Sequence, residues 1–124
     1  MIENIEYKIK FKINKLNNDK YMGFGISPNH VDVDEYIYDI YNAYDYFAFG
    51  SLHFNSDLVE LDEKLEANEG DIISFIYNKP KHTLAVFIND KEIYQFKDVT
   101  DTKYKWAVSV YNTDGDSIAV LSVS

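Results

Sequence analysis

The sequence predicts an all-β protein, an antiparallel β-sandwich of about nine or more short strands with little or no helix. Three observations lead to this prediction. Ile5–Ile13 alternates between apolar and charged side chains, which is typical of a strand with one buried and one wet face. Gly70–Phe96 holds three more strand patterns joined by two turns. Short apolar runs separated by turn residues continue to the C-terminus, as in sandwich folds.

The first two strands are predicted to be joined by a turn. After Ile5–Ile13, the polar residues Asn17–Asp19 indicate a turn, and Lys20–Ser27 is the returning strand. Gly23 and Gly25 lie inside that strand without the helix or the further glycine of a phosphate-binding loop. We therefore expect them to permit close packing or a bulge.

The next segments are less regular. Phe47–Phe54 alternates and is predicted to be one strand. In Asn55–Glu69, the spacing of Leu58, Leu61 and Leu65 would permit a short helix, but we expect this stretch to be mostly non-helical.

The central segment carries the strongest pattern. Asp71–Tyr77 is rich in β-branched and aromatic residues on both of its faces, as a strand inside a two-layer structure requires. Asn78–His82 contains a proline and breaks the run. Thr83–Ile88 and Lys91–Phe96 then form a hairpin around Asn89-Asp90, residues that tolerate left-handed backbone conformations.

The C-terminal part completes the sandwich. Tyr104–Tyr111 and Asp116–Val123 are predicted strands, and Asn112–Gly115 is a tight turn between them. Trp106, the only tryptophan, shares a face with Val108, so core packing is the expected role and a binding platform is the alternative.

Val31–Tyr46 is the least ordinary segment, because it combines five tyrosines with five acidic residues and follows no simple period. Such a segment is a candidate binding loop on a rigid scaffold. The alternative is a short strand at Tyr36–Tyr41 whose tyrosines pack inward.

Composition narrows the classes of function. The 124 residues are enough for one domain, and the absence of cysteine excludes disulfides and thiolate chemistry. A net charge of −9 disfavours nucleic acid and anionic membranes as partners. The N-terminus resembles no signal peptide, and no apolar run is long enough to cross a membrane, so a soluble cytoplasmic protein is expected.

Nothing in the sequence predicts an enzyme, a cofactor or a metal site. The three histidines, His30, His53 and His82, lie far apart without zinc-site spacing, and His53 is expected to be an ordinary strand residue. No nucleophile elbow is present. Asn112–Asp116 offers alternate oxygen ligands, but a hairpin turn explains the same residues and the completing glutamate of a calcium loop is absent.

Several motifs together resemble the SPRY (B30.2) domain family. They are Gly70-Asp71 before a strand, Leu84, Phe87, Asn89 and Asp90 in the hairpin, Tyr104–Tyr111 (YKWAVSVY), Gly115–Val123, Tyr21–Ser27 (YMGFGIS) and Phe49–Leu52 (FGSL). The resemblance covers most of the chain from about residue 20 onward and implies a concanavalin- or jelly-roll-type sandwich. Trp106 departs from the family, which usually has proline there. Little sequence precedes Tyr7, so we expect a single domain that lacks one or two N-terminal strands or is cut from a longer chain.

The resemblance implies a non-catalytic protein-interaction module that binds a short peptide. In that family the matching loop positions are Tyr111, Asn112 and Thr113. Composition alone adds a second group of candidate ligand-binding residues: Tyr38, Tyr41, Tyr44 and His30. Because Asp32, Asp34 and Asp39 lie among these tyrosines, the expected partner is a basic or polar peptide.

Two other functions stay open. Exposed aromatic rings could stack on sugars in a lectin-like, carbohydrate-binding sandwich. Alternatively, a sheet with an open edge could accept a strand from a partner, which would make the chain a structural subunit of a larger assembly.

Overall fold

The computed structural model describes residues 6–28, 43–55, 57–61, 65–99, 103–110 and 115–123. Within these ranges the chain forms ten β-strands and no helix. The strands are β1 (Glu6–Lys15), β2 (Met22–Pro28), β3 (Tyr44–Phe47), β4 (Ser51–Phe54), β5 (Asp57–Val59), β6 (Ile72–Asn78), β7 (Thr83–Ile88), β8 (Lys91–Phe96), β9 (Tyr104–Val110) and β10 (Ser117–Val123). The prediction of an all-β fold with nine or more strands is confirmed.

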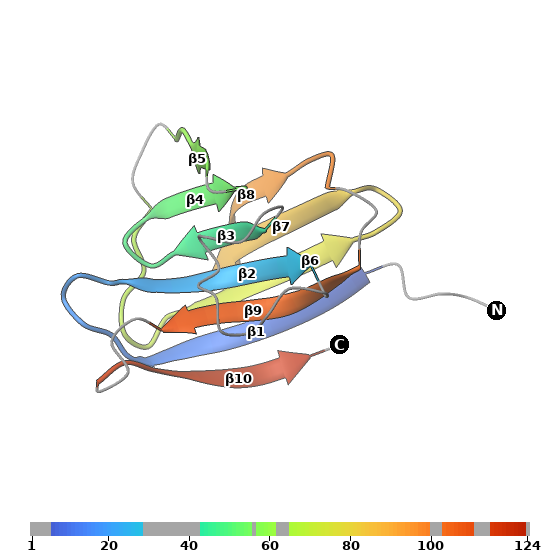
Figure 1. Ribbon diagram of the computed structural model, residues 1–124. Coiled ribbons are helices and arrows are strands. Elements are labelled where there is room, and N and C mark those ends of the chain that lie inside the picture. The colour runs from blue at the N-terminus through green and yellow to red at the C-terminus, as the bar shows by residue number, and fades with distance from the viewer. Residues whose placement is uncertain are drawn as a thin grey trace.

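The strands form two five-stranded antiparallel sheets stacked as layers (Figure 1). Sheet A has the order β10-β1-β6-β7-β8, and sheet B has the order β5-β4-β3-β2-β9. On one side of the sandwich the edge strands are therefore β10 and β9. Both lie along the lower side of Figure 1, together with β1.

The core lies between the sheets and is built from alternate positions of the strands. Its buried members include Ile9, Phe11 and Ile13 of β1, Met22, Phe24 and Ile26 of β2, Ile73, Phe75 and Tyr77 of β6, and Leu84 and Val86 of β7. The rings of Phe11 and Phe24 meet across the two sheets with centroids 5.4 Å apart. The alternation in β1 therefore points one face inward and leaves its lysines outside, as predicted.

The central strands β6, β7 and β8 match their predicted ranges within one residue. Asn89 and Asp90 both have positive φ, 49° and 67°, which is the geometry of a two-residue hairpin turn whose twist suits the flanking strands. The Asn89 side chain fixes this turn, because its Nδ2 donates to Asp71 Oδ1 at 2.9 Å and its Oδ1 accepts from the Ile72 amide at 2.9 Å. The Gly70-Asp71 motif thus supports the hairpin from the neighbouring strand.

The predicted single strand at Phe47–Phe54 is wrong. The structure has two antiparallel strands here, β3 and β4, joined by a turn at residues 48–50. Gly50 has a φ of 107°, and its amide donates to the Phe47 carbonyl oxygen at 2.9 Å. The apolar positions change parity here, from Phe47 and Phe49 to Leu52 and Phe54, and the break at Gly50-Ser51 coincides with the reversal.

The stretch at residues 55–69 contains β5 and no helix where the structure describes it. Leu58 is 61% exposed, so the leucine spacing does not mark a buried helical face. The expectation of a mostly non-helical stretch holds for the described part. The predicted alternative strand at Tyr36–Tyr41 lies outside the described residues. No helix in the described ranges could span a membrane.

Gly25 permits a close approach between β2 and β3 of sheet B. A Cβ atom added at Gly25 would lie 1.9 Å from the carbonyl oxygen of Tyr44. No side chain fits there, so the expectation that a glycine of this strand serves close packing is confirmed at Gly25.

Candidate functional site

The sandwich has a groove at the end where β1 begins and β6 ends. The groove has a volume of about 300 Å³ and lies between the two sheets. Its lining comprises Tyr7, Tyr77 and Lys79 from sheet A and the turn after β6, and Ile26, Lys103, Tyr104, Lys105 and Trp106 from sheet B and the residue before β9. Aromatic rings and lysines therefore dominate its wall.

Strand alternation and register bring the aromatic residues together. Tyr7 continues the inward face of Ile9 and Phe11 in β1, and it pairs directly with Tyr77 of β6. In sheet B, Trp106 pairs with the buried Ile26 and therefore also points inward. The pairing places rings from both sheets at the same end of the sandwich.

The rings form a continuous wall. The Tyr7 and Tyr77 rings are stacked with centroids 6.1 Å apart, and Tyr77 meets Tyr104 edge-on at 5.9 Å. Trp106 lies 6.1 Å from Phe75, so it packs against the core, as expected, while part of it lines the groove. Tyr7 remains 38% exposed, which leaves ring surface open to a ligand.

Three lysines give this end a positive charge, although the whole chain carries −9. Lys79 and Lys103 are exposed, and Lys105 is half-buried. No Asp or Glu is found among the described residues that line the groove. Lys79 and Lys103 make no ion pair with any residue that the structure describes. The charged side chains among the described lining residues are therefore all lysines.

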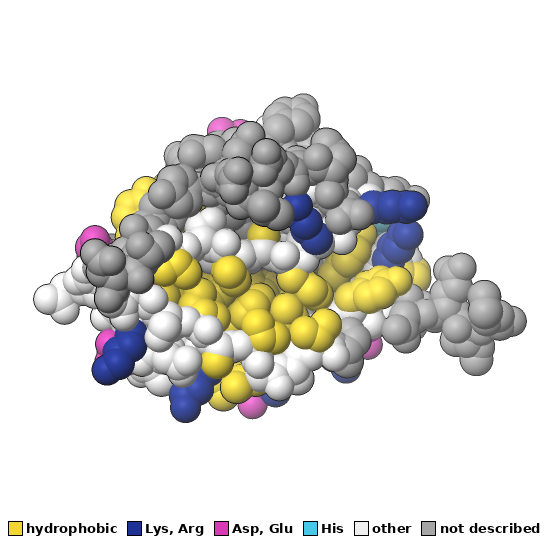
Figure 2. Space-filling model, turned by 60° about the horizontal axis from the view of Figure 1, so that its bottom comes forward, with side chains coloured by type: hydrophobic (Ala, Val, Ile, Leu, Met, Phe, Trp, Pro, Cys, Tyr) yellow, Lys and Arg dark blue, Asp and Glu magenta, His cyan; other side chains and the backbone are white. Residues whose placement is uncertain are grey.

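The apolar surface continues from the groove along the open side of the sandwich. Figure 2 shows hydrophobic side chains gathered in a band on this face, with lysines beside its right-hand end. Among the exposed large hydrophobic residues are Val108 of β9 and Val120 of β10, which are 45% and 58% exposed. These residues occupy inward-facing positions of the two edge strands, where neither sheet covers the other completely.

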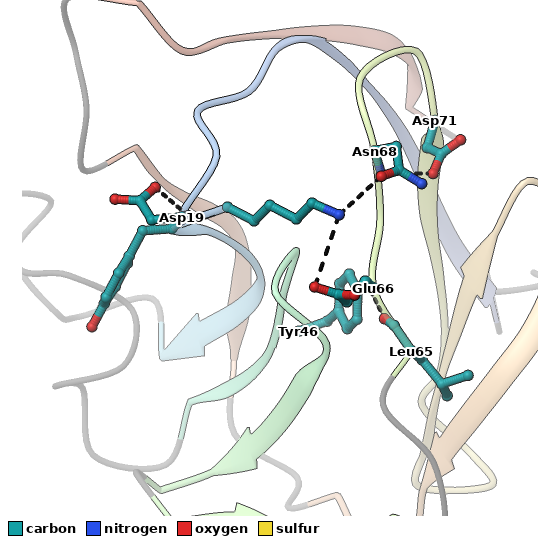
Figure 3. A network of polar contacts seen from close by, with 8 residues as sticks. Asp19, Tyr46, Leu65, Glu66, Asn68 and Asp71 are labelled. Atoms are coloured by element: carbon teal, nitrogen blue, oxygen red, sulfur yellow. Dashed lines mark hydrogen bonds and ion pairs between the residues drawn. The ribbon is translucent and has the colours of Figure 1, made fainter.

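A polar network at residues 65–71 is structural rather than a ligand site (Figure 3). Lys20 Nζ donates to Asn68 Oδ1 at 2.9 Å and lies 3.9 Å from a carboxylate oxygen of Glu66. The Tyr46 hydroxyl donates to the Leu65 carbonyl oxygen at 2.6 Å. These contacts fasten the stretch before β6 to the first turn and to β3.

Asp45 and His53 form a buried polar pair between β3 and β4. Asp45 Oδ1 lies 2.6 Å from His53 Nδ1, and Asp45 is 1% exposed. Burial raises the pKa of the Asp45 carboxyl, and the hydrogen bond with His53 opposes that rise. His53 is therefore a strand residue, as predicted, with a structural partner that the sequence did not reveal.

Tyr44 is the only predicted ligand-binding residue that the structure describes. It lies in β3, is 3% exposed, and stacks on Phe54 with ring centroids 4.4 Å apart. Its ring contributes to the core and presents no surface to a partner. The others lie outside the described residues: His30, Tyr38, Tyr41, Tyr111, Asn112 and Thr113.

The strand register separates the starting points of the two predicted groups. Pro28, where β2 ends, pairs with Tyr104, whereas Val110, where β9 ends, pairs with Met22. The segment that carries Tyr38 and the turn that begins at residue 111 therefore leave sheet B at opposite ends. At about 3.3 Å per residue, these points are roughly 20 Å apart.

Sequence reasoning missed the groove, because its lining comes from four separate parts of the chain. The apolar alternation could have placed Tyr7 and Tyr77 on inward faces, but only the β1–β6 register brings them together. In the described ranges, no group of three or more His, Cys, Asp and Glu residues is placed to hold a metal ion.

Comparison with known proteins identifies the fold. The sequence matches no protein-family model and no curated protein. Among solved structures, the SPRY domain of human HERC1 matches with a TM-score of 0.78 and 22% identity over 96% of this chain and 76% of that one. Another human SPRY domain matches with a TM-score of 0.74 and 14% identity, over 94% and 76% of the two chains. Stonustoxin matches with a TM-score of 0.69 and 11% identity, over 94% of this chain and 19% of its own. The chain is a SPRY-like β-sandwich, and the predicted fold is confirmed.

Proposed function

We propose that this SPRY-like sandwich is a non-catalytic protein-interaction module that binds a short peptide segment of a partner through its loops. The binding surface is the tyrosine-rich acidic segment with Tyr38 and Tyr41, together with Tyr111, Asn112 and Thr113 from the turn after β9. The partner segment is basic or polar.

The observation that carries this proposal is how the tyrosine-rich segment is attached to the sandwich. The part of the segment that carries Tyr38 and Tyr41 lies in the sequence between Pro28 of β2 and Ala43, and β2 and β3 are buried along their whole length. A loop held at both ends by rigid strands is the usual location of a binding site on a sandwich. Asp32, Asp34 and Asp39 would attract cationic partners, and tyrosine rings would supply contact area at low entropic cost.

Selection from a displayed peptide library tests this proposal. The native domain should enrich a short consensus with basic or polar residues. A Tyr38→Ala/Tyr41→Ala variant and a separate Tyr111→Ala variant should each bind the consensus peptide more weakly. The two variants are kept apart because their segments leave sheet B at opposite ends.

Two controls show whether weaker binding comes from loss of the tyrosine rings rather than from loss of folding. A Tyr38→Phe/Tyr41→Phe variant keeps the ring area and should retain most of the affinity, and the unfolding midpoint of every variant should match that of the native domain. Failure to enrich any peptide, or full binding by all three tyrosine-to-alanine changes combined, would refute the assigned surface.

A structural subunit is the second candidate, and the edge strand β10 favours it. Within the described residues β10 pairs only with β1, and Ser117–Val123 contains no charged residue. Leu121 and Val123 are 48% and 62% exposed. Natural edge strands are usually protected by charges or bulges against pairing with other chains; β10 has a register shift at Leu121 but carries no charge.

The mass in solution distinguishes the two candidates. A subunit that pairs through β10 should show a mass that rises with concentration, and Leu121→Lys should abolish the rise by placing a charge on the edge. A domain that stays monomeric at high concentration would exclude self-association through β10.

A further inference from the structure

We infer that a second groove, between the edge strands β5 and β8, binds an arginine side chain of the basic partner segment. This inference rests on the proposed function, because it names the side chain by which the partner is anchored. The guanidinium group lies on aromatic rings at the floor of the groove and donates hydrogen bonds to Asp57 and Asp98 at its rim.

The groove lies between strands at the edges of the two sheets, β5 with its neighbour β4 in sheet B and β8 in sheet A. These three strands lie along the upper side of Figure 1. The groove has a volume of about 520 Å³, which is within the usual range of ligand sites. Its described lining residues are Tyr44, Phe54, Val59, Tyr94, Gln95, Phe96, Lys97 and Asp98.

Strand register makes the floor of the groove aromatic. Phe54 pairs with the buried Tyr44, and Tyr94 pairs with the buried Val86, so both rings lie on inward faces. The Phe54 ring stacks on Tyr44 with centroids 4.4 Å apart, and the Tyr94 ring meets Phe96 edge-on at 5.0 Å. Phe54 and Tyr94 are only half-buried. The accessible part of these rings can therefore attract a cation.

Two carboxylates stand at the rim. Asp57 pairs directly with Phe54, so its side chain lies on the same face of sheet B. Asp98 lines the groove with a φ of 58°, and the next residue, Val99, is held by His82. The Val99 amide donates to the His82 carbonyl oxygen at 2.9 Å, and His82 Nδ1 lies 3.1 Å from the Val99 carbonyl oxygen. This part of the rim is therefore fixed before a ligand binds.

Charge favours a cationic ligand. Asp57 and Asp98 are exposed and make no ion pair with any residue that the structure describes. Glu60 beside them is also exposed, whereas Lys97 is the only cationic residue in the described lining. The net charge of −9 acts in the same direction. Four charged residues beside the lining in the sequence fall outside the described ranges and are acidic on balance: Asp62, Glu63, Lys64 and Asp101.

Arginine suits this groove better than lysine does. Its guanidinium group is planar, stacks on aromatic rings, and donates hydrogen bonds in a fork that matches a carboxylate. A lysine ammonium group meets the same charges but cannot stack as a plane. A neutral sugar could also pack on the rings, but it would gain nothing from the excess of carboxylates.

An NMR titration with a defined probe tests the inference. The probe is a blocked Gly-Arg-Gly-Arg-Gly peptide, and the matched peptides carry lysine or citrulline, an uncharged analogue of arginine, in the same positions. We expect saturable shifts of the Phe54, Asp57, Tyr94 and Asp98 signals with the arginine peptide. The lysine peptide should bind more weakly, and the citrulline peptide at least about fivefold more weakly.

Three variants locate the site, once their unfolding midpoints have been compared. Asp57→Asn/Asp98→Asn should weaken binding of the arginine peptide about fivefold, because two exposed ion pairs are lost, and asparagine tolerates the positive φ at position 98. The control Asp19→Asn/Asp90→Asn loses the same charge in turns away from the groove and should weaken binding less than about twofold. Tyr94→Leu keeps apolar bulk and should weaken binding about threefold through loss of the ring.

Three results would overturn the inference. These are the absence of saturable shifts at the groove, equal losses in the two charge variants, and shifts of the same size with the citrulline peptide or with maltose. The loop proposal survives each of them if a selected peptide still depends on Tyr38 and Tyr41. It fails alone if the arginine peptide shifts the groove signals while the tyrosine-to-alanine variants keep full binding of the selected peptide.

Discussion

Replacing Gly25 with alanine tests how closely β2 and β3 pack. The new Cβ would lie 1.9 Å from the Tyr44 carbonyl oxygen and 2.9 Å from the Asp45 Cα, whereas ordinary contact begins at 3.4 Å. Both nearest atoms belong to the backbone, so no side-chain rotation can relieve the clash. The two strands must separate locally by about 1.5 Å, which is the shortfall between the first distance and ordinary contact.

The cost follows from the ladder that this separation disrupts. β2 and β3 pair over four positions, from Gly23 with Phe47 to Ile26 with Tyr44. Losing two or three backbone hydrogen bonds of about 0.5–1.5 kcal/mol each gives a loss of roughly 2–4 kcal/mol. That is a large fraction of the roughly 5–15 kcal/mol that stabilises a typical domain. The melting temperature should fall by about 10 °C.

Two other glycines serve as controls in the same urea and thermal unfolding experiments. Gly115→Ala meets nothing within 4 Å and should change the free energy of unfolding by less than about 0.5 kcal/mol. Gly70→Ala also meets nothing within 4 Å, but Gly70 has a φ of +88°, so alanine there should cost about 1–2 kcal/mol through backbone strain. If Gly25→Ala is as stable as Gly115→Ala, the close approach of β2 and β3 is not real.

Two further substitutions test the buried polar groups. Tyr46→Phe removes the 2.6 Å hydrogen bond to the Leu65 carbonyl oxygen and should cost about 1 kcal/mol in urea unfolding; an unchanged midpoint would contradict that bond. Burial raises the pKa of the Asp45 carboxyl above its ordinary 3.8, so the stability that it contributes is complete below that pH and declines as pH rises through the raised pKa. Asp45→Asn should therefore lack this decline as pH rises above about 3.8, whereas the exposed control Asp90→Asn should keep it. Parallel pH profiles for Asp45→Asn and the native domain would refute the assignment.

Local pattern determined the strands, because burial on one face of a strand imposes a two-residue period that can be read from neighbouring residues. β7 was predicted with the observed bounds, Thr83–Ile88, since Asn89-Asp90 marks its end as clearly as alternation marks its interior. The wrong prediction at Phe47–Phe54 also has a local cause. The apolar positions shift from Phe47 and Phe49 to Leu52 and Phe54, so the parity changes at Gly50-Ser51, where the chain reverses.

Which residues reach the candidate site depends on pairing between strands that are far apart in the sequence. Tyr44 occurs in a tyrosine-rich segment, and composition placed it with the surface tyrosines, but its pairing with Ile26 and stacking on Phe54 bury it in the core. Tyr7 and Tyr77 are seventy positions apart in the sequence and become neighbours only through the β1–β6 register.

The sequence by itself thus determined the fold class, most strand positions and the turns at Asn17–Asp19 and Asn89-Asp90, because each depends on residues close together in the chain. The tertiary structure decided which tyrosines are buried, that the two candidate loop groups leave opposite ends of β2, and that three lysines gather around an aromatic groove on an acidic domain. These features depend on strand order and register, which join residues that no local pattern connects.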